Sequence, residues 1–412
     1  MLIPLCLALA CAPQGSDDAQ VAFEAWTEDA VTLIGQLEGM HPDPFFGCPR
    51  EEFDRGVDEF LGGLEGASEN QALAGFMRLF ARLSAHGREG HSVVWPLHGH
   101  VLPLTLYGFA DGWFVVDAEG PVRRHVGARV TAIGGVPIEE ACARVTPLLT
   151  RDNDWNLRFK LPFALATVEI LDGVGLAEGP DRVRLSLEQD GKPQDISVQG
   201  APGMSFTHVA LPPQGGAIWL EGHEEAFRLK VLEPEHALYV QYNQVVPQAS
   251  DGRLLDDFAQ EIVRVFEERG LAKVIVDVRC NGGGDNTTFG PLIRALQTPS
   301  IDRPGVLFGL IGRATFSAAG NFVTVLQRDT KAILLGEPTG GAPNQYGDAR
   351  SVELPRHPGL LVRIATRYHE FSTSDDARLT HEPHRAVPLR SEDYFAGRDP
   401  VLRAALDYQA PR

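Results

Sequence analysis

The sequence lacks several patterns that identify common classes of enzyme. It contains no HExxH motif for a catalytic zinc ion and no G-x-S-x-G nucleophile elbow. Its five cysteines form no CxxC pair. Beyond the first residues only Cys48, Cys142 and Cys280 remain, and an odd number gives no disulfide framework, so we expect buried small apolar side chains. The sequence thus indicates no metal ion and no cofactor.

Basic residues and long apolar runs are also scarce. Lys and Arg together number 37 against 55 Asp and Glu, a formal net charge of −18. Such a surface repels phosphate backbones, which argues against nucleic acid as a partner. No apolar run of about 18 residues follows the first residues, so we expect no transmembrane helix. The chain shows no repeats and no low-complexity tract.

The first residues are the one membrane-related signal. Residues 1–10 read MLIPLCLALA and precede Cys11, an arrangement that resembles a bacterial lipoprotein signal. A mis-assigned start and a buried first helix are the alternatives. We therefore expect a leader and tether over residues 1–20, and a periplasmic or cell-envelope lipoprotein anchored through lipid on Cys11, in preference to a secreted protein.

The rest of the chain divides into three parts by pattern. Residues 21–98 carry apolar positions at helical spacing, as in FDRGVDEFLGGL. Residues 99–211 hold short β-type runs between Gly and Pro, such as GWFVVDA. Residues 212–412 alternate strands and helices, which indicates parallel pairing. The predicted fold is α/β, multi-domain and α+β overall, with an N-terminal helical region, a β-rich module and an α/β core.

Two segments of the core could carry chemistry, although each has an ordinary structural explanation. Asn281 and three glycines, Gly282 to Gly284, follow the strand KVIVDVR, where they form either a turn or a nest of backbone N–H groups for an oxyanion. Ser317 lies between the strand GVLFGLIGR and the next helix, where it is either an N-cap or a nucleophile. Neighbouring parallel strands would bring both around one carbonyl group.

These segments resemble the tail-specific (C-terminal processing) protease superfamily, which includes tricorn and interphotoreceptor retinoid-binding protein. KVIVDVRCNGGGDN is similar to its "D-L-R-x-N-x-G-G" segment, and GRATFSAAGNF to its nucleophile segment. HPDPF, EGHS and the ending SEDYFAGRDPVL also match in order and spacing. The resemblance implies a crotonase-like core, and GARVTAIGGVPIEE resembles the PDZ-like module of these proteases, which can capture a peptide.

The resemblance also implies roles for residues. Ser317 matches the nucleophile, and the N–H groups of Gly283 and Ala318 match the oxyanion hole. The Lys that the processing proteases use would fall on Ala342, so that dyad is absent. His91, in EGHS, stands where the tricorn-like branch has its general base.

An acid that orients the base is expected downstream of the nucleophile, as in tricorn. The stretch TRYHEFSTSDDARLTHEP offers Glu370, Asp375 and Asp376, and the sequence does not choose among them.

Together these expectations describe an exported serine-type endopeptidase that hydrolyses envelope or extracellular polypeptides through an acyl-enzyme. Its partners would be peptide or protein substrates, and the sequence says nothing of oligomeric state. One alternative is a non-catalytic binding protein for a peptide or apolar ligand on the same scaffold. A crotonase-type acyl-CoA enzyme is another, against which the export signal speaks.

Overall fold

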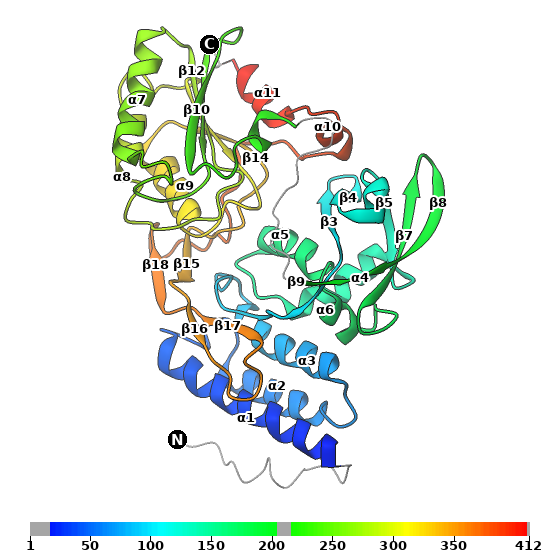
Figure 1. The fold of residues 1–412 in the computed structure, drawn as a ribbon. Coiled ribbons are helices and arrows are strands. Elements are labelled where there is room, and N and C mark those ends of the chain that lie inside the picture. Colours follow the sequence, from blue (N-terminus) through cyan, green and yellow to red (C-terminus); the bar gives the residue numbers. More distant parts are fainter. Residues whose placement is uncertain (1–16, 204–215, 410–412) are drawn as a thin grey trace.

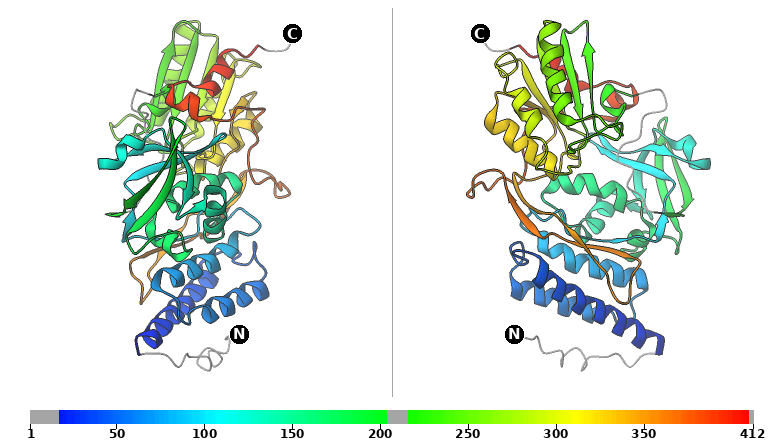
Figure 2. Two further views of the ribbon diagram at one scale, coloured as in Figure 1. Left: turned by 90° about the vertical axis from the view of Figure 1, so that its right-hand side faces the viewer. Right: turned by 60° about the vertical axis from the view of Figure 1, so that its left-hand side comes forward.

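The computed structural model describes residues 17–203 and 216–409, so the leader and Cys11 lie outside the described residues. Figure 1 shows helices α1–α3 at one end, an α/β core at the other, and a β-rich region beside them. Helices α1 and α11 thus lie at opposite ends of the molecule (Figure 2). No helix within those two ranges is long and apolar enough to cross a membrane.

The helical region consists of α1 (Asp17–Met40), α2 (Arg50–Gly62) and α3 (Glu69–Ala81). Ser68 begins α3 with a capping box, in which its side chain and that of Gln71 satisfy each other's backbone N–H groups. Most of α3 is buried because α1, α2 and the β-rich region pack around it. The predicted helices over this part of the chain are confirmed.

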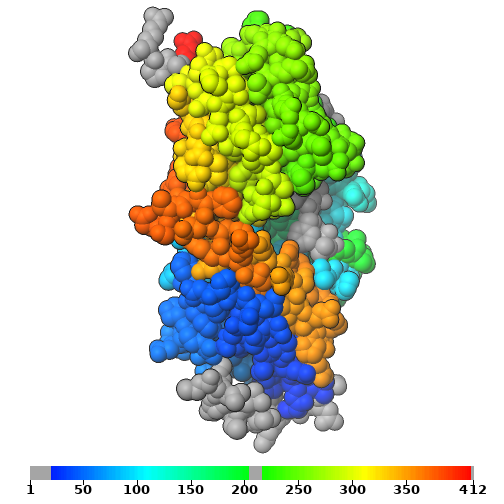
Figure 3. All heavy atoms as spheres, turned by 90° about the vertical axis from the view of Figure 1, so that its left-hand side faces the viewer, coloured from blue at the N-terminus to red at the C-terminus, as the bar shows by residue number. Residues whose placement is uncertain are grey.

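A three-stranded antiparallel sheet closes the helical region. Its order is β1 (Val93–Pro96), β17 (Leu360–Ile364) and β16 (Arg350–Val352). Val352 and Val362 share one apolar core with α1–α3, although the sequence places them after the nucleophile. In Figure 3 the segment around β18 lies between the helical region and the core. The last third of the chain therefore contributes to both ends of the molecule.

The β-rich region is a sheet of order β3-β4-β5-β7-β8, with β6 paired to β5. Gly134 and Gly135 adopt positive φ in the tight turn between β5 and β6. The elements of this region are β2 (Gly99–Val101), β3 (Leu104–Phe109), β4 (Gly112–Ala118), β5 (Arg129–Ile133), β6 (Val136–Pro137), α4 (Ile138–Val145), α5 (Asp154–Ala164), α6 (Val168–Gly173), β7 (Arg182–Gln189), β8 (Lys192–Gln199) and β9 (Ala201–Gly203).

The core is a sheet of order β10-β11-β12-β13-β14-β19, parallel from β11 onward. Its elements are β10 (Phe227–Leu232), β11 (Ala237–Tyr242), α7 (Leu255–Glu268), β12 (Lys273–Asp277), α8 (Gly290–Leu296), β13 (Leu307–Ile311), α9 (Ala318–Asp329), β14 (Ile333–Gly336), β15 (Asn344–Gly347), β18 (Arg367–Glu370), β19 (Arg385–Ala386), α10 (Ser391–Phe395) and α11 (Pro400–Leu406). Strands β11 and β13 are buried throughout because α7, α8 and α9 cover one face of the sheet and α11 the other.

Candidate active site

Ser317 occupies the junction between β13 and α9 in a strained conformation. Its φ of 55° and ψ of −130° lie where a residue with a side chain is disfavoured. Although it stands at the N-cap position of α9, its side chain makes no capping hydrogen bond. The ordinary explanation for a serine at a strand-to-helix junction therefore does not account for it, and its hydroxyl is free to meet another group.

That group is His91, from the loop between α3 and β1. Its Nε2 lies 2.9 Å from Oγ of Ser317. The imidazole also stacks on the ring of Phe316, with centroids 4.4 Å apart and planes 27° apart. The structure thus brings together the two residues that the sequence singles out as nucleophile and base.

The imidazole of His91 is held in its neutral form. Burial is the main cause, and the nearby side chains of Lys160 and His369 add to it, so that the pKa falls to about 3. A neutral ring can accept the serine proton at Nε2, provided that its own proton is on Nδ1. Nδ1 has no hydrogen-bond partner among the described residues; the backbone of Tyr346 favours the protonated ring but lies outside hydrogen-bonding geometry.

The glycine nest packs directly against the nucleophile. A Cβ on Gly283 would lie 2.6 Å from Cβ of Ser317 and 2.9 Å from the backbone N of Ala318, and the φ of Gly283 is 108°. Only glycine fits here. The N–H of Gly283 donates to Oδ1 of Asn281 at 2.9 Å, whereas Ala318 opens α9, where backbone N–H groups have no partner within the helix.

The structure does not bring Glu370 or Asp375 to His91. Both side chains are exposed, and no hydrogen bond or ion pair among the described residues joins either to the imidazole. Glu370 lies in β18 opposite Asn344. The expected orienting acid is therefore absent from these two positions, because their segment runs along the surface of α9.

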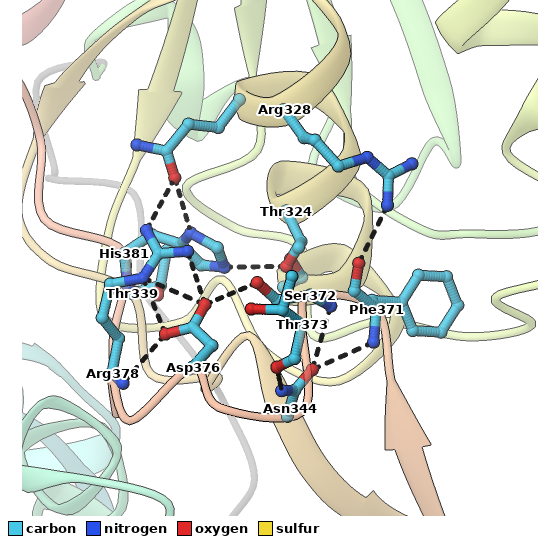
Figure 4. Close-up of polar contacts among 12 residues, drawn as sticks. Thr324, Arg328, Thr339, Asn344, Phe371, Ser372, Thr373, Asp376, Arg378 and His381 are labelled. Atoms are coloured by element: carbon cyan, nitrogen blue, oxygen red, sulfur yellow. Dashed lines mark hydrogen bonds and ion pairs between the residues drawn. The ribbon is translucent and has the colours of Figure 1, made fainter.

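Asp376 is held elsewhere. It accepts from the hydroxyl of Ser372 at 2.6 Å and forms an ion pair with Arg378, and Figure 4 shows this cluster beside α9. The hydrogen bonds from Arg378 hold the pKa of the Asp376 carboxyl well below its usual range. This carboxylate stabilises the loop that follows β18 and is not directed at the serine.

A different acid, Asp152, holds the segment that carries His91. It is fully buried, and its Oδ1 accepts the N–H of Gly90 at 2.6 Å. Lys160 of α5 donates to the carbonyl of the same Gly90 at 2.8 Å. A Cβ on Gly90 would lie 2.9 Å from oxygens of Asp152 and Asn156, so glycine is required at this position. Both backbone groups of the residue before His91 are therefore fixed by ionisable side chains, of which Asp152 is buried and Lys160 half-buried.

The second oxygen of Asp152 reaches the loop behind the nucleophile. Its Oδ2 accepts the N–H of Ala342 at 3.2 Å. The neighbouring Gly341 approaches so closely that a Cβ there would lie 3.3 Å from Cα of Phe316 and from N of Ser317. One carboxylate thus links the segment of the base to the loop that supports the serine.

The pair formed by Asp152 and Lys160 was not anticipated from the sequence. Burial raises the pKa of Asp152 and lowers that of Lys160, since each charge loses its solvation. A lysine within the largely apolar helical stretch LRFKLPFA is the one signal that could have drawn attention to them.

Two of the short motifs noted in the sequence meet beside this pair. His41 of HPDPF lies with Nε2 2.8 Å from Oε2 of Glu89 of EGHS, and both side chains are buried. Asn281, which precedes the glycine nest, connects it to the segment that carries Ser317, because the carbonyl of Asn281 accepts the N–H of Phe316 at 3.1 Å. Within residues 17–203 and 216–409, no cluster of His, Cys, Asp and Glu could hold a metal ion.

No family model matches the sequence, and no curated protein matches it. Solved structures do match. A mutant of CPAF matches with a TM-score of 0.64 at 13% identity, covering 95% of this chain and 99% of that chain. Mature CPAF complexed with lactacystin matches with a TM-score of 0.62 at 14% identity, covering 94% and 97%. The photosystem II D1 C-terminal processing protease gives a TM-score of 0.40 at 15% identity, covering 90% and 94%. Over nearly its whole length the chain therefore has the fold of CPAF, and the α/β architecture expected from the sequence is confirmed.

Proposed function

We propose that this protein is a serine endopeptidase of the tail-specific protease superfamily, with Ser317 as nucleophile and His91 as general base. The observation that carries this proposal is the 2.9 Å contact between Oγ of Ser317 and Nε2 of His91, made by a serine in a strained conformation. Strain of this kind is concentrated at functional sites. The imidazole, half-buried and kept neutral by its loss of solvation, supplies the proton acceptor that a serine needs at neutral pH.

The reaction would follow from this geometry. Oγ of Ser317 attacks the carbonyl carbon of a peptide bond while Nε2 of His91 takes the hydroxyl proton. The oxyanion faces the N–H of Ala318 and that of Gly283, once the latter turns from Asn281 to the substrate. The C–N bond then breaks, His91 returns the proton to the leaving amine, and an acyl-enzyme remains. Water, deprotonated by the same imidazole, hydrolyses the ester.

The remaining parts of the proposal concern location and peptide capture. The proposed substrates are polypeptides of the cell envelope or outside the cell, and the leader with Cys11 supports export and lipid attachment. The β-rich region between β3 and β8 is proposed to act as a PDZ-like module that captures an extended peptide. The match of GARVTAIGGVPIEE to such modules supports this role.

The test is covalent labelling with a fluorophosphonate probe, which reacts with activated serines. We expect wild type to be labelled, Ser317→Ala not at all, and His91→Ala at a rate lowered by about 10²–10⁴-fold, the usual contribution of a general base. His98→Ala is the matched control, because His98 is exposed. A folded wild type that takes no label would contradict the proposal and favour a non-catalytic protein that binds a peptide or an apolar ligand.

A further inference from the structure

A cavity of about 360 Å³ lies directly beside the general base. Gly90 and His91 form one part of its wall, and Thr150 and Lys160 another. The mechanism above uses His91 but gives the cavity no role. Its volume falls at the lower end of the range for ligand pockets and exceeds the roughly 150 Å³ that holds benzene in an engineered apolar cavity. It has room for an aromatic ring or a long aliphatic chain.

The wall follows from the register of β1 and β17. Val93 and Trp95 are two residues apart and so point to the same side of β1. They pair with Arg363 and Leu361 of β17, and all four line the cavity. Helices α3 and α5 and the loop before α5 complete it with the apolar residues Met77, Phe80, Leu148, Leu149, Phe159 and Phe163. The cavity is therefore an apolar space between two helices and one sheet face.

The two cationic side chains in the wall leave the cavity apolar in character. Nζ of Lys160 is already engaged by the carbonyls of Gly90 and Thr150 at 2.8 and 2.7 Å, and by Oγ1 of Thr150 at 3.4 Å. Arg363 is an exposed residue and donates to the carbonyl of Ala349. The lining contains no Asp or Glu. The lining is therefore mostly apolar, and an apolar occupant would lose its contact with water there.

We propose that this cavity binds the side chain of a large apolar residue of the substrate, on the amine side of the scissile bond. The inference rests on the proposed function, because it uses the role of His91. The base that lines the cavity also returns its proton to the leaving amine, so the residue that carries this amine lies next to the imidazole. A peptide with Phe or Leu at that position would place its side chain into the cavity.

The expected selectivity follows from the area that such a side chain buries. Full burial of a Phe or Leu side chain favours binding by an amount that corresponds to about tenfold to hundredfold in kcat/KM over Gly. Asp at the same position would be disfavoured, since its carboxylate would lose its solvation among mostly apolar side chains.

The experiment begins with digestion of unfolded casein and identification of the cut bonds by mass spectrometry. A quenched fluorescent peptide is then built on the best site, with Phe, Leu, Gly or Asp after the scissile bond. Leu361→Trp fills the cavity with a larger side chain from β17, a strand that is far in sequence from His91. Leu254→Trp, the same change at a residue that is 46% exposed, is the control. We expect wild type and the control to prefer Phe and Leu by at least tenfold, and Leu361→Trp to lose this preference.

Three outcomes would overturn the inference while fluorophosphonate still labels Ser317. The first is equal cleavage of all four peptides, and the second is a preference that Leu361→Trp leaves unchanged. The third combines equal cleavage of the four peptides with a second observation, that a free fatty acid raises the melting temperature of wild type but not that of Leu361→Trp. This result would assign the cavity to a lipid. Loss of labelling in wild type is a separate result and contradicts the proposed function itself.

Discussion

Replacing Asp152 by Ala tests whether a buried carboxylate holds the proposed base, His91, in place. The change removes the acceptor for the N–H of Gly90 and for that of Ala342, and it leaves Lys160 as a buried cation without its acid. Removing one partner of a buried charge pair costs about 3–5 kcal/mol. Asp152 and Lys160 are both hydrogen-bonded to the backbone of Gly90 and form no direct ion pair among the described residues. We therefore expect the free energy of unfolding to fall by the lower figure, about 3 kcal/mol.

The effect on catalysis should exceed what lost stability explains. A displacement of about 1 Å in a reacting group can cost about 10²-fold in rate. Nδ1 of His91 has no partner among the described residues, so the imidazole depends on its hydrogen bond with Ser317, its stacking on Phe316 and the fixed backbone of Gly90. We therefore expect the fluorophosphonate labelling rate of Asp152→Ala to fall by about 10²-fold under conditions where the variant stays folded.

The matched control is Asp29→Ala. Asp29 is also fully buried, and it accepts from the backbone of Arg356 at 3.0 Å and from His357 at 2.6 Å, in the helical region away from the serine. Urea unfolding should show comparable losses of stability for both variants, while labelling should fall only in Asp152→Ala. If both variants label at the same rate after the fraction folded is matched, Asp152 has a purely structural role and the reasoning is refuted.

Three further predictions concern the site and the helical region. Because the pKa of His91 is lowered to about 3, the labelling rate should stay level from pH 7 down to about pH 4, and a midpoint near 6.5 would contradict a buried, neutral base. Gly283→Ala should reduce the labelling rate at least about 100-fold, because the added Cβ has no room and losing one oxyanion donor costs about 100-fold in rate. Gly282→Ala is the control and should label like wild type, because a Cβ there meets open space. Equal labelling rates for the two variants would count against an oxyanion hole at the glycine nest. Burial lowers the pKa of His357, but Glu69 and Asp29 together outweigh it and raise this pKa above its usual value. The contribution of His357 to stability is therefore present below about pH 6.5 and lost as pH rises through the raised value, and urea unfolding at pH 5.5 and 8.5 should show this loss in wild type and not in His357→Gln.

The order of elements in the β-rich region and in the core could be predicted because each element is local in sequence. The run GWFVVDA coincides with β4, and KVIVDVR contains β12. The alternation of strands and helices indicates which strands are neighbours in the parallel sheet. It therefore predicts that Ser317 and the glycine nest lie at the same edge of that sheet. The partnership of Ser317 with His91 came from the resemblance alone, since no local pattern connects positions so far apart.

Other parts of the site depend on contacts that leave no local pattern. Asp152 stands in an ordinary polar stretch, and its role depends on two N–H groups from distant segments. Glu370 and Asp375 have the right chemistry and the right place in the sequence, but Glu370 ends β18 and Asp375 lies in the loop after it, and both side chains are exposed. Acidic residues on a surface and in a site look alike in sequence, because only burial distinguishes them.

The pairing of β1 with β17 sets the point at which the candidate site can be completed as the chain is made. The strand that follows His91 is completed by residues 360–364, which emerge from the ribosome after Ser317. Until then the core of α1–α3 lacks Val352 and Val362, which share it in the finished protein. A pairing of such long range also forms slowly. A chain that already contains Ser317 and His91 therefore lacks the full support of the His91 segment until residues 360–364 have paired with β1.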